Sequence, residues 1–362
     1  MACFVSFKVI RFSIILFVLL NLARPAQAWN AEGHMIVAQI AWNHLNPVAR
    51  ARCNSLIAVP LTNSSAGTSN FVTAAVWGDD FKSALGTSSW HFIDLPFSLD
   101  GTPTNGVGAA SFDVVRAIRT NILILQNPAA TLSNQAIHLR YLLHFVGDIE
   151  QPLHCSTAVS ASSPGGDAGG NGFSITGDWS NLHSLWDAGG GFLTDSISRP
   201  LTATGQNILN AKVAVIEADY PYDYAANVGT IPDPMNWARE GWSLAQTVCY
   251  AGLTEGDTPS AGYLDTAMAT AEQRMAAGGH RLADLLNTLY PAVPITITAT
   301  TITNGAIRFS WNTITGGVYR VQWKGSLAAP AWTDATNLTA SASSASFSQP
   351  LTATQRLYRV VQ

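Results

Sequence analysis

The 362-residue sequence has few charged side chains and few cysteines. Charged residues make up only 12% of the chain, with 19 basic against 23 acidic residues. A protein that binds nucleic acid by releasing counterions normally carries a basic face, and this composition does not favour that kind of binding. If the protein acts on phosphates, its positive charge has to come from something other than lysine and arginine.

The first 28 residues have the pattern of a secretory signal peptide. Lys8 and Arg11 precede the apolar run SIILFVLLNLA, and Ala26 and Ala28 form a small-x-small cleavage site. The run is about a dozen residues, short of the roughly 20 that cross a bilayer. We therefore predict an exported protein, secreted or periplasmic, that begins at Trp29. Because three basic residues and no acids lie in this segment, the mature chain has a formal net charge of −7.

The four cysteines are too few for a disulfide framework. Cys3 lies in the predicted signal peptide, which leaves Cys53, Cys155 and Cys249. An oxidising compartment permits at most one intramolecular disulfide among three thiols. We expect a disulfide bond, and the sequence does not choose the pair.

Hydrophobic spacing divides the mature chain into two parts. Residues 29–290 contain long segments with apolar residues at helical spacing, and turn residues mark loops near 60–70, 97–110 and 160–178. The clearest segments are HMIVAQIAWNHL, DVVRAIRTNILILQ, NQAIHLRYLLHFVGDI, NWAREGWSLAQTVCYAG and YLDTAMATAEQRMAAGGHRLADLLNTLY. This part is predicted to be a mainly α domain.

Residues 291–362 change to a period of two. The apolar residues alternate in ITITATTI, AIRFSW, VYRVQW and RLYRVV, with turn residues between them. We expect a small all-β sandwich that resembles the immunoglobulin-like or fibronectin-like tails of secreted bacterial hydrolases. It is predicted to be an accessory module whose partner is a cell surface or matrix.

Histidine and aspartate recur at helical spacing in two motifs. In HFVGDIEQPLHC, His144 and Asp148 share a helix face, and Gln-Pro ends the helix before His154. NLHSLWD repeats the spacing with His183 and Asp187. Either pair alone would more often be a helix cap or a surface ion pair, but together they predict a multinuclear metal site. Nitrogen and carboxylate ligands without thiolate favour zinc, and more weakly manganese or iron.

Two further segments supply ligands of the same types. WGDDF offers Asp79 or Asp80, and WHFIDLP offers His91 and Asp94 on an extended piece of chain. Alone, each would more often be structural.

The predicted mature N-terminus adds another ligand pair. After signal cleavage, the free amino group and carbonyl of Trp29 can chelate a metal, with His34 beside them. The remaining histidines, His44, His138 and His280, match no motif, and we expect them to be ordinary surface or core residues.

These motifs, in this order, resemble the zinc-dependent, single-strand-preferring type I nucleases of fungi and plants. The matching strings are Trp29 with His34 five residues on, WGDD, HFID, HFVGDIEQPLH, GGN and NLHSLWD. The resemblance covers residues 29–290 and implies the helical trinuclear-zinc fold shared with phospholipase C, with three Zn²⁺ per chain. It implies one zinc on Asp79, His91, His144 and Asp148, a second on Trp29, His34 and Asp148, and a third on His154, His183 and Asp187.

The resemblance also implies an activity. It predicts an endonuclease that hydrolyses single-stranded DNA and RNA to 5′-phosphorylated products, and a 3′-nucleotidase acting on 3′-mononucleotides. A water between the paired zinc ions would lose its proton near neutral pH and attack phosphorus in line, with the third zinc stabilising the leaving oxygen. Asp79 and Lys82 are the catalytic candidates, with Lys82 against the phosphate. Phe92 would stack on an unpaired base, and Asp94 would hydrogen-bond the base edge.

Two other functions remain open. A zinc phospholipase C also begins with a metal-binding tryptophan, but it has a longer first spacing than Trp29 to His34 and a glutamate in place of Asp187. A non-catalytic secreted binding module fits least well, because all nine ligand positions carry the expected residue types.

Overall fold

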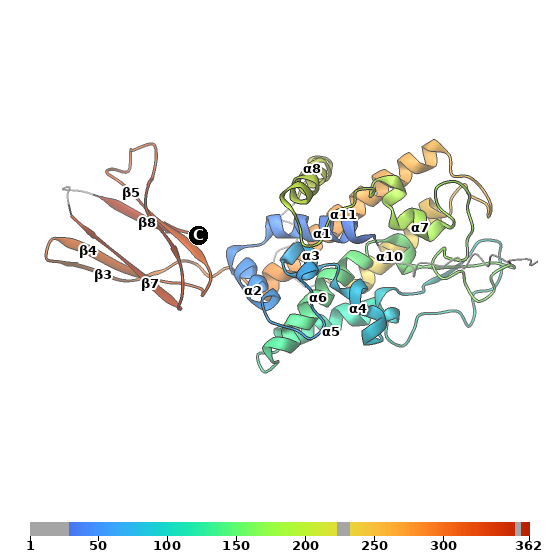
Figure 1. The fold of residues 1–362 in the computed structure, drawn as a ribbon, viewed down its shortest axis with the longest axis horizontal. Helices are drawn as coiled ribbons and strands as arrows, with labels where there is room; N and C mark the ends of the chain where they lie inside the picture. The colour runs from blue at the N-terminus through green and yellow to red at the C-terminus, as the bar shows by residue number, and fades with distance from the viewer. Residues whose placement is uncertain (1–28, 223–231, 352–355) are drawn as a thin grey trace, which may run out of the picture.

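The structure of this protein is a computed structural model that describes residues 29–222, 232–351 and 356–362. The predicted signal peptide therefore lies outside the described residues. Among those described, no helix combines the length and the apolar character needed to cross a bilayer. The chain forms a helical domain, and two small β-sheets lie to one side of it, next to α2 (Figure 1).

The helical domain is built from helices of very different length. The α-helices are α1 (Ala31–His44), α2 (Pro47–Ile57), α3 (Phe71–Ala74), α4 (Trp77–Leu85), α5 (Val114–Gln126), α6 (Leu132–Asp148), α7 (Leu182–Asp187), α8 (Ala203–Asp219), α10 (Pro234–Leu244) and α11 (Ala261–Leu289). Short 3₁₀ turns are η1 (Ala66–Thr68), η2 (Ser88–His91), η3 (Pro152–Cys155) and η4 (Gly189–Gly191), and η5 (Ala245–Cys249) is a π-helical turn that follows α10. The five segments with helical spacing are confirmed as helix.

A polar N-cap residue precedes several of these helices and caps their first turn. Asn30 accepts hydrogen bonds from the backbone N–H groups of Glu32 and Gly33 at the start of α1. Asp113, Thr131 and Ser260 cap α5, α6 and α11 in the same way. Each cap satisfies a donor that the helix itself leaves unpaired.

Helix α6 lies at the centre of the domain. Most of its residues are buried, including Leu142 and Phe145, and it packs against α1, α2, α4, α5 and α11. The polar residues His144 and Asp148 in its last turns are fully buried as well. Because a buried charge needs a partner of opposite charge, His144 and Asp148 require compensating groups in the middle of the fold.

The described residues form three β-sheets. β1 (Pro96–Ser98) pairs in parallel with β2 (Thr157–Val159) inside the helical domain. After α11, two antiparallel three-stranded sheets have the orders β3-β4-β7 and β6-β5-β8. Their strands are β3 (Ile297–Thr303), β4 (Ala306–Asn312), β5 (Val318–Lys324), β6 (Thr333–Thr339), β7 (Ser344–Pro350) and β8 (Leu357–Val361). The side chains of Phe309, Trp311, Tyr319 and Val321 form a small core for them. The fold class, mainly α with a C-terminal all-β part, is confirmed.

The expected disulfide bond is not found in the described part of the chain. Cys53 in α2, Cys155 in η3 and Cys249 in η5 are all buried and free. The thiol of Cys155 instead donates to the carbonyl of Ile149 at 3.2 Å. Three separate elements carry the cysteines, and each thiol is packed as a small apolar side chain.

Candidate metal centre

The last turns of α6 form one side of the centre. Nδ1 of His144 lies 2.7 Å from the carbonyl oxygen of Ala75, a distance that suits donation from the ring. Its Nε2 then faces the side chain of Asp148, 3.2 Å from Oδ2. The carboxylate and the imidazole are four residues apart and share one helix face, as the spacing predicts.

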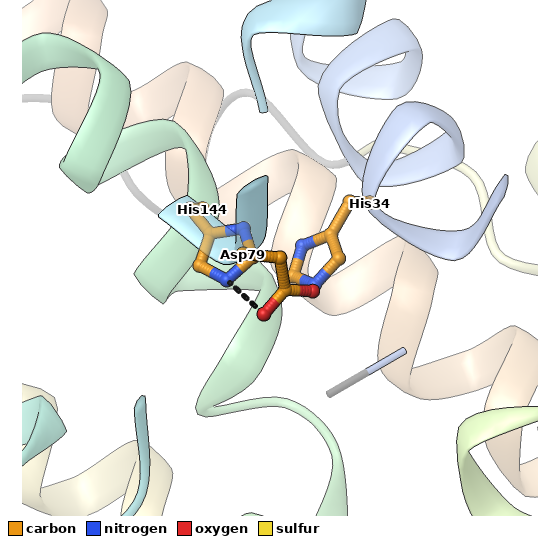
Figure 2. Close-up of side chains that lie close together, drawn as sticks. All are labelled: His34, Asp79 and His144. Atoms are coloured by element: carbon orange, nitrogen blue, oxygen red, sulfur yellow. Dashed lines mark ion pairs between the residues drawn. The ribbon is translucent and has the colours of Figure 1, made fainter. Parts of the chain in front are cut away.

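Three other elements bring side chains to the same place. Asp79 of α4 approaches His144, with 3.6 Å between Oδ1 and Nε2. His91, the last residue of η2, lies with Nδ1 2.9 Å from Oδ2 of Asp148. His34 of α1 lies with Nε2 3.4 Å from Oδ1 of the same carboxylate. Figure 2 shows the rings of His34 and His144 side by side, with the Asp79 carboxylate directed at them.

Two glycines allow the helices to come this close. A Cβ on Gly78 would lie 2.6 Å from the ring of His144, and a Cβ on Gly147 would lie 2.7 Å from Nδ1 of His34. Both distances are too short for any side chain, so α1 and α4 could not reach α6 with larger residues at these positions. The two glycines therefore belong to the geometry of the site.

A second cluster consists of His154, His183 and Asp187. His154 lies in η3 just after α6, and the other two residues are one turn apart in α7. Nε2 of His183 is 3.5 Å from Oδ2 of Asp187, and the other oxygen of Asp187 accepts a hydrogen bond from Gln151 at 2.8 Å. All three residues are buried.

The histidine pair of the second cluster is placed as metal ligands are. Nδ1 of His154 lies 2.8 Å from the carbonyl of His91, and Nδ1 of His183 lies 2.6 Å from the carbonyl of Gly169. If both Nδ1 atoms donate their protons to these carbonyls, the two Nε2 atoms, 3.2 Å apart, face each other with lone pairs. Such a pair needs a cation between its nitrogens, and backbone carbonyls commonly orient metal-binding imidazoles in this way.

The first cluster also lacks hydrogen bonds that its burial requires. Both oxygens of Asp148, Oδ2 of Asp79, both nitrogens of His34 and Nε2 of His91 are buried without a hydrogen-bond partner among the described residues. Burial of carboxylate oxygens without hydrogen bonds is costly unless positive charge lies close to them. This donor set fits one or more divalent cations.

Burial and neighbouring charges shift the pKa values of the residues in both clusters. Burial would lower the pKa of His144, but Asp148 and Asp79 outweigh it and raise that pKa to about 10. Burial would raise the pKa of Asp148, but His144 and His91 hold it well below its usual range. In the second cluster burial dominates, raising the pKa of Asp187 well above its usual range and lowering that of His183 to about 3. Without a cation, a proton on His144 balances the buried carboxylates of the first cluster, and burial keeps the groups of the second cluster neutral.

A pocket of about 200 Å³ opens onto both clusters. Its lining includes His91 from the first cluster, His154 and His183 from the second, and Lys82, Phe92, Asp94 and Asn171. Nζ of Lys82 donates to Oδ1 of Asp79 at 3.0 Å. Burial, together with the charge of Asp167, raises the pKa of Asp94 to about 6.

The backbone around Phe92 is hydrogen-bonded to α5 and to the segment that carries His154. The carbonyl of Phe92 accepts from the N–H of Val114 at 3.1 Å, and the N–H of Ile93 donates to the carbonyl of His154 at 2.8 Å. These bonds fix the main chain of Phe92 in the pocket wall, beside His91 and His154.

The sequence predictions can now be compared with these positions. Asp79 lies in the first cluster, whereas the neighbouring Asp80 is paired on the surface with Arg199 at 2.6 Å. The expectation of an extended segment is wrong for His91, which ends a 3₁₀ turn, and right for Phe92, whose φ is −147°. Trp29 is fully buried beside Gly33, at the start of the helix that carries His34.

Gln151 was missed as a contributor to the centre. Its side chain orients Asp187 and also accepts from the N–H of Leu153 at 2.6 Å. The available signal was its position between the ligands of HFVGDIEQPLH.

A sequence model of the S1/P1 Nuclease family matches residues 29–291. This protein belongs to the S1/P1 nuclease family. It is 28% identical to Nuclease P1 of Penicillium citrinum over 291 residues, which cover 72% of this chain and 98% of that relative. Endonuclease 2 of Arabidopsis thaliana is 28% identical, with 75% of this chain and 94% of the relative covered. Nuclease S1 of Aspergillus oryzae is 26% identical, with 74% and 94% covered.

A solved structure of Clostridium perfringens alpha-toxin aligns with 91% of this chain and 84% of its own, with a TM-score of 0.35 and 12% identity. That likeness is too weak to support an argument. Membership of the S1/P1 nuclease family makes the protein a nuclease, and the histidine and aspartate clusters are groups that could hold its metals.

Proposed function

We propose that this protein is a secreted zinc-dependent endonuclease that hydrolyses single-stranded DNA and RNA to 5′-phosphorylated products and also acts as a 3′-nucleotidase. Residues 29–290 are its nuclease domain, and residues 291–362 are an accessory β module. The observation that carries the proposal is that two buried His/Asp clusters open onto one pocket that also contains Phe92 and Asp94, in a chain of the S1/P1 nuclease family.

Three zinc ions fit the donor set, because the ligands are imidazoles and carboxylates and the thiols lie elsewhere. The ligands are Asp79, His91, His144 and Asp148 for the first ion, the main chain of Trp29 with His34 and Asp148 for the second, and His154, His183 and Asp187 for the third. Oδ1 of Asp148 faces His34 and its Oδ2 faces His91 and His144, which supports its role as the residue shared by two ions.

Bound zinc supplies a water that ionises near neutral pH and positive charge at the phosphate. The protein positions the other groups. Lys82 directs its ammonium toward the pocket while Asp79 accepts a hydrogen bond from it, so the cation is held where a phosphate oxygen would arrive. Gln151 fixes the orientation of Asp187.

Base recognition falls to Phe92 and Asp94. The Phe92 ring stacks on a base, and stacking accepts any of the four bases but requires that the base be unpaired. The Asp94 carboxylate accepts hydrogen bonds from base N–H groups. This arrangement supports a preference for single strands with little sequence selectivity.

Export and the role of the β module remain predictions from the sequence. The signal-peptide pattern in the first 28 residues supports secretion or a periplasmic location, with the mature chain starting at Trp29. A cell surface or matrix is the partner that we propose for residues 291–362.

The proposal can be tested with two adjacent aspartates. The mature protein is incubated with circular single-stranded DNA, the duplex circle, single-stranded RNA and a 3′-mononucleotide, with and without a zinc chelator. Asp79→Asn should lose at least about a hundredfold in kcat, because it removes a ligand and the partner of Lys82. Asp80→Asn, the matched control on the same helix turn, removes only a surface pair of about 0–1 kcal/mol and should stay near wild type.

Phosphatidylcholine is the substrate that distinguishes a nuclease from the alternative, a phospholipase C. Cutting of the single-stranded circle that a chelator stops, with the lipid untouched, is the expected result. Lipid hydrolysis with intact DNA would make the protein a phospholipase C and remove the roles given to Phe92 and Asp94.

A further inference from the structure

A third group of potential ligands lies outside the metal centre, where α8 crosses α1 and α11. It consists of His44, the last residue of α1, Glu217 of α8 and His280 of α11. One ligand atom of each lies within 4.8 Å of the other two. His34 and His44 are on the same helix, about 15 Å apart at 1.5 Å per residue, so this group is distinct from the centre described above.

The carboxylate of Glu217 is already oriented toward the histidines. Its Oε1 contacts Nε2 of His44, and its Oε2 accepts a hydrogen bond from Nδ2 of Asn43 at 3.2 Å. One oxygen thus lies against a histidine of the triad while a neighbouring amide holds the other, which is the usual support of a metal-binding carboxylate. The side chains of His44 and Glu217 are 25% and 22% exposed, so solvent reaches the pair.

His280 provides the observation that an ordinary ion pair does not explain. Its Nε2 is buried and has no hydrogen-bond partner within the described residues. Burial, and secondarily the nearby His44, lower the pKa of His280 to about 4, so its ring is neutral and offers a lone pair. A cavity of about 400 Å³, lined also by Glu240 and Asp284, reaches His280 from the side of α10.

Aromatic packing fixes both rings. Tyr222 stacks on His44, with ring centroids 4.2 Å apart, and meets the ring of His280 edge-on at 5.1 Å. The hydroxyl of Tyr222 donates to Asp284. Tyr222 therefore holds the imidazoles of His44 and His280 in place where α1, α8 and α11 meet.

We propose that His44, Glu217 and His280 form an additional zinc site. Two imidazoles and one carboxylate are a known ligand set for Zn²⁺, with water completing the tetrahedron. Ligand atoms about 2.1 Å from the ion lie about 3.4 Å from one another, so binding moves Glu217 away from His44 and His280 inward. The ion would tie α8, which lies at the outer edge of the domain (Figure 1), to α1 and α11.

The test measures zinc content in the full-length mature protein, stripped of metal and dialysed against Zn²⁺. Glu217→Gln keeps the size of the side chain and the acceptor for Asn43 but removes the carboxylate charge, and His280→Gln removes the unpaired imidazole. Asp284→Asn is the control, because it changes a carboxylate that lies beside His280 but outside the ligand triad, and the asparagine oxygen can still accept from Tyr222. Wild type and Asp284→Asn should each bind one zinc per chain more than Glu217→Gln and His280→Gln, with unchanged circular dichroism.

Equal zinc content in all four proteins would overturn the proposal. A second measurement uses thermal melting, where added Zn²⁺ should raise the melting temperature of wild type more than that of Glu217→Gln. Equal zinc-induced shifts in the two proteins would count against the site. Since both readouts are differences between variants, they do not depend on how many ions the nuclease centre holds.

Discussion

Replacement of Gly147 by alanine tests whether His34 is a zinc ligand. Gly147 precedes Asp148 in the last turn of α6, and its added Cβ would lie 2.7 Å from Nδ1 of His34. The contact must open by about 0.8 Å to reach an ordinary van der Waals distance. Because Nε2 of His34 lies 3.4 Å from Oδ1 of Asp148, this movement separates two ligands of the proposed second zinc.

The energies predict a folded but impaired enzyme. Alanine in place of a helical glycine favours folding by about 0.5–1 kcal/mol, whereas overpacking costs about 1–3 kcal/mol. The net change in the free energy of unfolding is small for a domain of this size. A ligand misplaced by nearly 1 Å, however, lowers turnover by about a hundredfold. We expect one zinc fewer per chain and a hundredfold lower kcat, with a melting temperature within several degrees of wild type.

The assay compares zinc content, kcat on single-stranded DNA and thermal melting in Gly147→Ala and Gly262→Ala. Gly262 lies in α11, where an added Cβ meets no atom within 4 Å, so it controls for the helical preference of alanine. Full zinc content and wild-type kcat in Gly147→Ala would refute the assignment of His34. Loss of activity in Gly262→Ala as well would show that the effect is not local.

Three further outcomes follow from the charges of the site. Zinc binding to the metal-free protein at pH 7 should release protons, since the pKa of His144 is raised to about 10 without metal. Calorimetry in buffers of different ionisation enthalpy measures this proton release. Heats of binding that do not depend on the buffer would contradict it. Since Asp94 is protonated below its pKa of about 6, KM for a guanine dinucleotide should rise as pH falls through 6 in wild type, but not in Asp94→Asn; parallel profiles would remove its role. Among described residues lining the pocket, Lys82 is the only lysine or arginine, so KM should change about threefold between 50 and 200 mM salt, and a much steeper dependence would indicate a basic track elsewhere.

The helical part of the fold was predictable because its signals are local. The spacing of apolar residues reveals α1, α5, α6, α10 and α11, and Gln-Pro marks the end of α6. The strands β6 and β7 were not predicted. Their sequences, TDATNLT and SASFSQP, consist mainly of small polar residues, and only pairing with the apolar strands β5 and β4 identifies them.

The site was predictable where a pair of ligands shares one helix turn. His144 with Asp148 and His183 with Asp187 satisfy that condition. Spacing alone did not choose between Asp79 and Asp80; the family resemblance favoured Asp79, and in the structure Asp79 faces His144 while Asp80 pairs with Arg199.

His44 and His280 show the limit of such reasoning. They are separated by more than 200 positions in the sequence and meet only because α1 packs against α11. No motif joins residues whose proximity depends entirely on tertiary packing.

The acidic composition and the proposed substrate are compatible for a physical reason. A phosphate needs positive charge, and buried carboxylates such as Asp148 need it too, so ions held by the protein satisfy both inside one pocket. Positive charge concentrated in this way acts only on a phosphate that enters the pocket. In the proposed site an unpaired base would follow and stack on Phe92, whereas a base in a duplex must first leave its helix at a cost of a few kcal/mol. The preference for single strands would then come from the small charged pocket itself, without a surface that distinguishes the two forms.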